Sequence, residues 1–187
     1  MSPFEYAMVL ISIIVGLGVT HILSGLGAAV HRLRGHGPPI HLEITYLTWV
    51  AFIFFQLVFF WWWEFKWSEL APELGIGLFL FLVLYAVVLF SLVVILVPHQ
   101  LSVVDDSWDY FLSIRSWFYG GLLIMNAVDL ADTLMKGVEW DTRFSYLSFW
   151  TAVTVAGVVG LTTTRRSVTP HSLSRCWFGT SLQASTT

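Results

Sequence analysis

Five long apolar stretches constrain the fold of this chain more than any other feature of its sequence. They cover residues 6–30, 42–63, 74–97, 110–134 and 144–164. A helix needs about 20 apolar residues to cross the hydrocarbon core of a bilayer. Because lipid offers no hydrogen bonds to the backbone, each stretch must satisfy its own amide groups, which a helix does. The sequence therefore predicts an all-α polytopic transmembrane helical bundle with five spans.

The composition supports the bilayer as the solvent of this chain. Of its 187 residues, 57% are apolar and only 11% are charged, whereas soluble domains carry about 25% charged residues. A soluble fold of this size could not hide so much apolar surface. The net charge of −3 offers no basic surface for nucleic acid. We therefore expect lipid as the main partner, with self-association or another membrane subunit, and neither nucleic acid nor a cofactor.

The chain divides into a membrane bundle and a tail. Residues 1–166 form the bundle, and the polar, patternless residues 167–187 form a C-terminal tail that we expect to be disordered. The first span lacks the basic residues that precede the apolar core of a secretory signal peptide. Glu5 stands there instead, so we interpret this span as a retained helix.

Arginine and lysine are distributed unequally between the two ends of the predicted spans. One side of the membrane receives Arg32, Arg34, Arg115, Arg165, Arg166 and Arg175, and the other receives Lys66, Lys136 and Arg143. The cytoplasmic side of a membrane protein carries the excess of these residues. The pattern therefore predicts an outside N-terminus and a cytoplasmic C-terminus.

Small residues recur every four positions in two of the spans. The first span contains Ser12, Gly16, Thr20, Ser24 and Ala28, and the last contains Ser148, Ala152, Ala156 and Gly160. Helices in lipid associate through such residues because they let backbones approach closely. We therefore expect both ladders to be helix contacts. The span 74–97 has no charge and neither a polar nor a small-residue stripe, so we expect it at the periphery, facing lipid.

A resemblance to a known family covers about residues 3–137. It rests on "SPFEYAMVLISIIVGLGVTHILSGLG", followed downstream by "SWFY" and "DLADTLMKG". This pattern resembles a family of small bacterial multi-pass proteins of unassigned function, in which F-E-Y leads into a Gly-rich first helix. The resemblance implies a bacterial inner-membrane protein and implies no activity.

Six polar side chains inside the spans are candidates for a functional site. They are Glu5, His21, Arg115, Asn126, Asp129 and Asp132. Ionisable groups in a bilayer are costly and usually face the interior of the bundle. The topology places Glu5, Glu64, Asp129 and Asp132 at the outer level, and His21 and Arg115 in the inner half. At 100° per residue, Asn126 and Asp129 share one stripe with Arg115, so we expect the helix at 110–134 to be central.

One interpretation of these groups is a path for protons or cations. Glu5 and Asp129 would share a proton at the outer level, and Asn126 would solvate a passing ion. Histidine is the side chain that titrates near neutral pH, so His21 would pass a proton inward, and Arg115 would set the field at the inner exit. The protein would then be a small proton- or cation-conducting oligomer.

The other interpretation is structural, and the sequence leaves it open. Asp132 would pair with Lys136 at i+4 on the surface, and Glu64 would extend to the interface. Asp129 would hydrogen-bond a neighbouring helix, and His21 would donate to a backbone carbonyl. The protein would then be a non-catalytic membrane scaffold or accessory subunit.

Neither an enzyme nor a metal site is favoured by the sequence. The metalloprotease motif H-E-x-x-H is absent, and His21 and Ser24 lack an orienting acid. His31, His36 and His41 are spaced so that they could hold a transition metal with His99, but we expect a solvated loop.

Aromatic residues cluster at the end of the second span. Trp61, Trp62, Trp63 and Trp67 belong to the segment "FFWWWEFKW". Tryptophan is enriched at membrane–water interfaces, so we interpret the segment as an aromatic belt. The alternative is a platform for a quaternary amine or a sugar, because aromatic faces bind cations.

Overall fold

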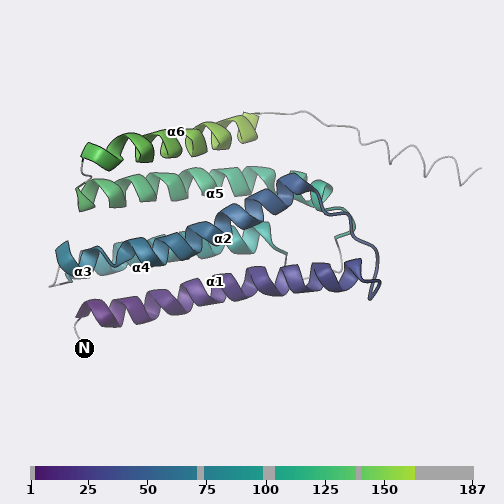
Figure 1. Cartoon of the computed structure of the whole chain (residues 1–187), viewed down its shortest axis with the longest axis horizontal. Coiled ribbons are helices and arrows are strands. Elements are labelled where there is room, and N and C mark those ends of the chain that lie inside the picture. Colours follow the sequence, from purple (N-terminus) through teal and green to yellow (C-terminus); the bar gives the residue numbers. More distant parts are fainter. Residues whose placement is uncertain (1–2, 71–73, 99–103, 138–139, 163–187) are drawn as a thin grey trace, which may run out of the picture.

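Five long helices lie side by side in the computed structural model of the chain, which describes residues 3–70, 74–98, 104–137 and 140–162 (Figure 1). The helices are α1 (Pro3–Leu33), α2 (Ile44–Glu64), α4 (Ile76–Leu96), α5 (Ser107–Lys136) and α6 (Trp140–Thr162), with a single turn, α3 (Trp67–Leu70), after α2. The predicted helix boundaries agree with these within a few residues. The prediction of an all-helical bundle is confirmed, and the predicted tail, 167–187, lies outside the described residues.

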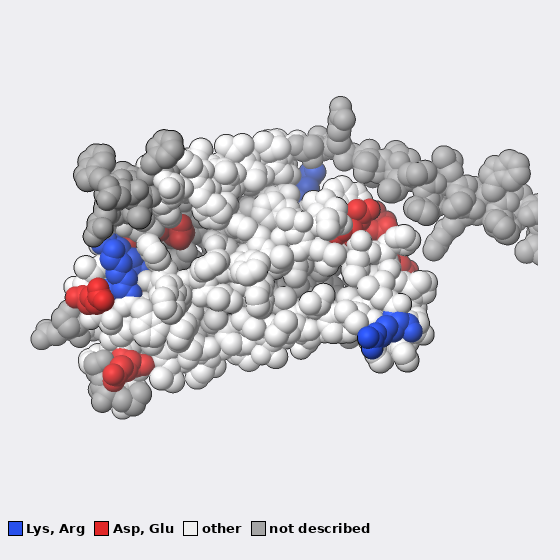
Figure 2. Space-filling model, viewed as in Figure 1, with Lys and Arg blue, Asp and Glu red and all other residues white. Residues whose placement is uncertain are grey.

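Four stretches of the described chain are long and apolar enough to cross a membrane. They are Pro3–Leu33, Ile44–Leu70, Ile76–Leu96 and Ser145–Thr162. Helix α5 is not among them, because charged and polar side chains lower its hydropathy. The charged side chains visible in Figure 2 lie towards the two ends of the molecule, with a largely uncharged middle. This distribution is that of a helical membrane protein.

The helices form layers, with α1 at one edge and α6 at the other (Figure 1). Helix α4 packs against α1, α2 and α5, and α5 packs against α4 and α6. The prediction that residues 74–97 lie at the periphery is therefore wrong, since Leu82, Ala86 and Leu89 are fully buried. A helix that is apolar on all sides fits a bundle interior as well as it fits lipid. The central position predicted for α5 agrees with these contacts.

The small-residue ladder of α1 does not make the contacts expected of it. Gly16, Thr20 and Ser24 are exposed, and a Cβ atom built on Gly16 would meet nothing within 4 Å. The large side chains Ile11 and Ile22 are buried on the opposite side of the helix. Close approach occurs on that side instead, at two other glycines. There, a Cβ on Gly18 would lie 3.1 Å from a Leu57 methyl group, and one on Gly25 would lie 2.5 Å from Val97 Cγ1.

The ladder of α6 is also only partly a contact. Ser148 and Ala152 are exposed, and Ala156 is half-buried. A Cβ on Gly160 would collide with the ring of Tyr119 from α5. The contact between these helices therefore uses the end of the predicted ladder together with Gly157, where a Cβ would lie 2.8 Å from Leu123 Cδ2.

Two leucine substitutions in α1 distinguish its faces. We expect Gly25→Leu to lower the stability of the detergent-solubilised protein by about 1–3 kcal/mol, because overpacking forces side chains and backbone to move. Gly16→Leu, at an exposed position of the same helix, should leave the stability of the monomeric chain within about 0.5 kcal/mol of wild type. Thermal unfolding of the two variants checks this. Equal losses at both positions would contradict the assignment of the faces.

Three side chains satisfy the carbonyl groups at the end of α4. The last four carbonyls of a helix have no partner within it. Tyr110 donates to the Ile95 oxygen at 2.9 Å and Tyr46 to the Leu96 oxygen at 3.1 Å, and His21 Nε2 lies 2.8 Å from the Val97 oxygen. These bonds come from α5, α2 and α1, so they fix three helices to one helix end.

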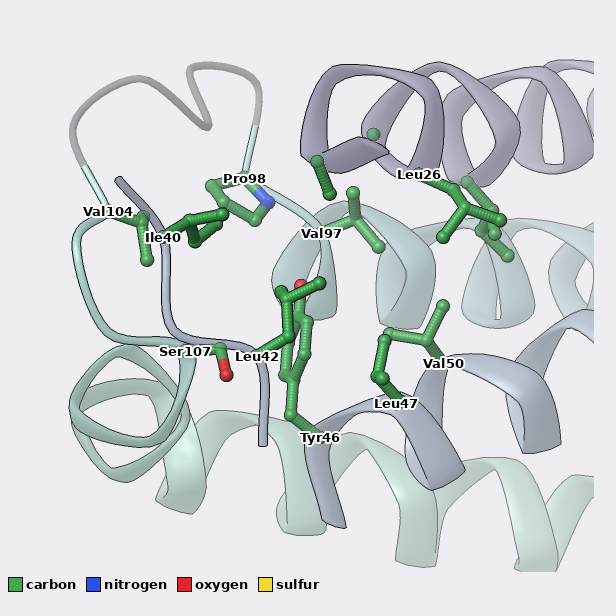
Figure 3. A pocket seen from close by; sticks show the side chains of 13 residues that line it. Leu26, Ile40, Leu42, Tyr46, Leu47, Val50, Val97, Pro98, Val104 and Ser107 are labelled. Carbon is green, nitrogen blue, oxygen red and sulfur yellow. The ribbon is translucent and has the colours of Figure 1, made fainter. Parts of the chain in front are cut away.

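The two loops at this end of the bundle are also joined. Arg32 is buried and donates to the carbonyl oxygens of Pro38, Pro39 and Val104 at 2.7–3.0 Å. An apolar cavity of about 30 Å³ lies between these loops and the ends of α1, α2 and α4. Figure 3 shows Leu26, Val97 and Tyr46 among its walls. It holds about one water-sized volume, so this end is a packed junction.

Candidate ion-binding site

The last turns of α5 carry four polar residues on one face. Asp129, Asp132, Thr133 and Lys136 follow the spacing i, i+3, i+4 and i+7, which places them on one side of a helix. The helix ends at Lys136 because Gly137 has φ +69°, a conformation that glycine adopts without strain. The lysine therefore stands in the last turn of α5.

Lys136 is the centre of a buried ion cluster, which consists of Glu64, Asp132 and Lys136. Its Nζ lies 2.6 Å from Asp132 Oδ2 and 3.1 Å from Glu64 Oε1. The three side chains are only 1–2% exposed. The i,i+4 pair of Asp132 and Lys136 was expected on the surface, and Glu64 at the interface. Both expectations are wrong, because the chain after α2 turns back over the pair.

Tryptophans cover this cluster. Trp67, from α3, is 7% exposed and donates from Nε1 to Asp132 Oδ1 at 3.0 Å. The Lys136 ammonium lies 5.6 Å from the centre of the Trp67 ring and 6.0 Å from that of Trp63. Trp62 is 71% exposed, whereas Trp67, which was expected in the same aromatic belt, is a buried part of the site.

One carboxylate oxygen of the cluster is left over. Both oxygens of Asp132 and the Oε1 atom of Glu64 accept hydrogen bonds. Glu64 Oε2 is buried and accepts none from the part of the chain that the structure describes. A buried acceptor without a partner costs about 1–3 kcal/mol, and more when it is charged. This oxygen therefore has both the capacity and the energetic reason to bind a proton or a cation.

Asp129 is held by two tyrosines from neighbouring helices. Tyr85 of α4 donates to Oδ1 at 2.8 Å, and Tyr146 of α6 donates to Oδ2 at 2.7 Å. The side chain thus joins three helices, as the structural interpretation of the sequence expected. Both oxygens of Asp129 therefore have a hydrogen-bond partner.

Asn126 lies on the same stripe but in a dry helix contact. Its Nδ2 donates to Thr154 Oγ1 at 2.6 Å and to the Trp150 carbonyl at 3.2 Å. The indole of Trp150 donates back to the Asn126 backbone carbonyl at 2.8 Å. These bonds fasten α5 to α6, so Asn126 fixes the geometry of the site from one turn away.

A cavity of about 230 Å³ adjoins the cluster. Its walls come from α2, α4, α5 and α6 and consist of Gln56, Phe59, Phe60, Trp62, Trp63, Glu64, Tyr85, Asp129, Thr133, Tyr146 and Phe149. Two residues with carboxyl groups, Glu64 and Asp129, therefore line one cavity with mainly aromatic walls. Lys136 stands behind Glu64 and does not line it.

The other predicted residues lie elsewhere. Glu5 is exposed on α1, which packs on α2 and α4. His21 is tied to the end of α4 and lines a separate cavity of about 460 Å³ on the face of α1. Arg115 is half-buried fourteen positions before Asp129 on α5. None of the three lines the aromatic cavity.

Several residues of the site were not singled out from the sequence. Trp67 was assigned to the aromatic belt, and Tyr85 and Tyr146 were given no role. A tyrosine in an otherwise uncharged helix was the available signal, since its hydroxyl needs a partner when buried. No group of three or more His, Cys, Asp or Glu side chains in residues 3–70, 74–98, 104–137 and 140–162 is arranged to hold a metal ion.

Fold and site together define the class as a helical membrane protein with a buried ion cluster at one end of its bundle. Comparisons of the chain with protein-family models, with curated proteins and with solved structures found no match.

Proposed function

We propose that this protein is a five-span bacterial inner-membrane protein that conducts protons or cations as a small oligomer. The observation that carries the proposal is the buried Oε2 of Glu64, which has no partner among the described residues and belongs to a side chain that lines a cavity. A buried carboxylate oxygen of this kind binds the ion that compensates it. The bacterial inner membrane follows from the sequence resemblance.

The fifth crossing is supported by the place of α5. It packs between α4 and α6, and both of these are long and apolar enough to cross. Its 30 residues correspond to about 45 Å at 1.5 Å per residue, against a hydrocarbon core of about 30 Å. Its charged groups near Lys136 are paired inside the bundle, as membrane helices require.

The charge balance of the site favours a bound cation. Three carboxyl groups, Glu64, Asp129 and Asp132, adjoin a single lysine, Lys136. If all were ionised, the site would carry an excess of two negative charges. In a medium of low dielectric constant such an excess attracts protons or cations strongly. Glu64 is the carboxyl with an oxygen to spare for one of them.

Self-association is supported by the exposed ladder of α1. Gly16, Thr20 and Ser24 leave a shallow, small-residue face on the outside of the bundle. Such faces let membrane helices of two chains approach closely. The cavity at Glu64 and the cavity at His21 have no lining residue in common. A second copy against α1 would add walls to the cavity at His21.

Ion flux into liposomes tests the proposed function. We expect the purified protein, reconstituted in liposomes, to dissipate a proton, Na⁺ or K⁺ gradient faster than protein-free liposomes do. An internal pH-sensitive dye and ion-selective electrodes measure this. No flux of any of the three ions above the protein-free level would overturn conduction and would favour the alternative, a non-catalytic scaffold or accessory subunit.

We also propose an outside N-terminus and a cytoplasmic C-terminus, on the arginine distribution. The N-terminal end of α1 and the C-terminal end of α6 lie at opposite ends of the bundle (Figure 1), which is consistent with an odd number of crossings. A C-terminal fusion to green fluorescent protein should fluoresce, and one to alkaline phosphatase should be inactive. The reverse pair of results would contradict the orientation.

A further inference from the structure

The walls of the cavity beside Glu64 point to a particular class of cation. Seven of its eleven lining residues are aromatic: Phe59, Phe60, Trp62, Trp63, Tyr85, Tyr146 and Phe149. The remaining four are Gln56, Thr133 and the two carboxyl residues Glu64 and Asp129. The cavity thus combines negative charge with aromatic faces, and none of the described residues that line it is basic.

We infer that this cavity binds an organic ammonium cation, held by the carboxylate of Glu64 and the faces of the surrounding rings. The inference rests on the proposed function and names the substrate class of its site. Aromatic rings attract cations through their quadrupole, with tryptophan the strongest, and quaternary ammonium ligands are commonly recognised in this way. The compensating charge for the spare oxygen of Glu64 would then come from the ligand.

The molecule already contains one ammonium group bound in this manner. Lys136 Nζ contacts the carboxylates of Glu64 and Asp132 and lies over the rings of Trp63 and Trp67. Trp63 and Glu64 also line the cavity. The same two residues therefore border both Lys136 and the cavity, and the second oxygen of Glu64, which is buried, is still unused.

The walls suit an organic cation better than a metal ion. Hard cations such as Mg²⁺ and Ca²⁺ require several oxygen ligands in place of their hydration shell, and most of this wall is hydrocarbon. A volume of about 230 Å³ is several times the share of one water molecule in the liquid, about 30 Å³. Phe59 and Trp62 are 60% and 71% exposed, so the cavity is accessible from the outer surface of the bundle, where amphiphilic cations collect.

Binding of choline to the purified full chain tests the inference, with 3,3-dimethylbutan-1-ol as a neutral ligand of the same shape. Titration calorimetry in detergent should show choline binding at one site per chain. The neutral alcohol should bind about ten-fold more weakly, because it lacks the charge that the rings and Glu64 recognise. Equal binding of the two ligands would show that the cavity recognises only apolar shape and not charge, and it would overturn the inference.

Two tryptophan variants supply a matched control. Trp62→Leu removes an exposed wall of the cavity, whereas Trp117→Leu removes a tryptophan of α5 that is 77% exposed and does not line it. Trp62→Leu should weaken choline binding about ten-fold, and Trp117→Leu should leave it unchanged. Glu64→Gln should abolish it. Choline binding that is equal in wild type, Trp62→Leu and Glu64→Gln would place the ligand elsewhere and overturn the inference.

The outcomes separate this inference from the proposed function. If wild-type liposomes conduct protons and choline does not bind, conduction stands and the organic cation is rejected. If choline binds as described and no ion flux is found, the site is an ammonium-binding site and conduction is rejected. If choline binds and slows the proton flux, both stand, because the two cations compete for Glu64.

Discussion

Lys136→Met should destabilise the protein more than any other single substitution in the site. The change leaves Glu64 and Asp132 buried together without the ammonium group that lies 3.1 and 2.6 Å from their oxygens. Removing one partner of a buried ion pair costs about 3–5 kcal/mol, because the remaining charge stays uncompensated. Thermal unfolding in a mild detergent should show the loss as a large fall in the midpoint temperature.

The control and the rescue make this prediction specific. Lys66→Met removes a lysine near the same end of the bundle that takes no part in the cluster, so its effect should be within about 0.5 kcal/mol. The triple variant with Lys136→Met, Glu64→Gln and Asp132→Asn should recover much of the loss, because it leaves no charge in the cluster. A Lys136→Met protein as stable as wild type would contradict the burial of the cluster.

Helix number and ends were predictable because they depend on local composition. A stretch of about 20 apolar residues is typical of a helix long enough to cross a membrane. The predicted stretches match α1, α2, α4, α5 and α6 within a few residues. The order and direction of the helices then follow from short connections. Which neighbour each helix faces was harder to predict. Helix α4 was expected to face lipid, and the small-residue ladder of α1 was expected to contact another helix.

The position of α4 could not be predicted because hydropathy does not distinguish lipid from protein. Lipid tails are as apolar as leucine, so burial in the bundle and exposure to lipid cost a Leu- and Val-rich helix much the same. In α1, a small-residue face and a face with Ile11 and Ile22 both offered a contact. The face with the larger side chains makes the contact, because these side chains fill the space against α2 and α4.

The candidate site was predictable in part. Asp129, Asp132 and Lys136 share a helix face by their spacing, and Glu64 was placed at the same level by the topology. The burial of their pairing depends on Trp67 in the single turn α3, which periodicity cannot reveal. Glu5 was grouped with Asp129 by depth, and His21 was added as a titrating group in the inner half. Neither argument specifies which helices are neighbours.

Glu64→Gln should abolish ion flux while leaving the protein folded. The glutamine keeps the size of the side chain and an oxygen for Lys136, which retains Asp132 as its charged partner at 2.6 Å. It removes the negative charge and the spare carboxylate oxygen that the proposed function requires. Equal thermal midpoints for the variant and wild type would show that a loss of flux is not a loss of fold.

The central claim is that Glu64 binds the conducted ion, and flux through Glu64→Gln liposomes tests it most directly. Glu69→Gln is the matched control, since Glu69 is an exposed carboxylate five residues further along the chain. At equal protein density, Glu64→Gln liposomes should conduct no faster than protein-free liposomes, and Glu69→Gln liposomes should match wild type. Wild-type flux through the Glu64→Gln protein would contradict the account.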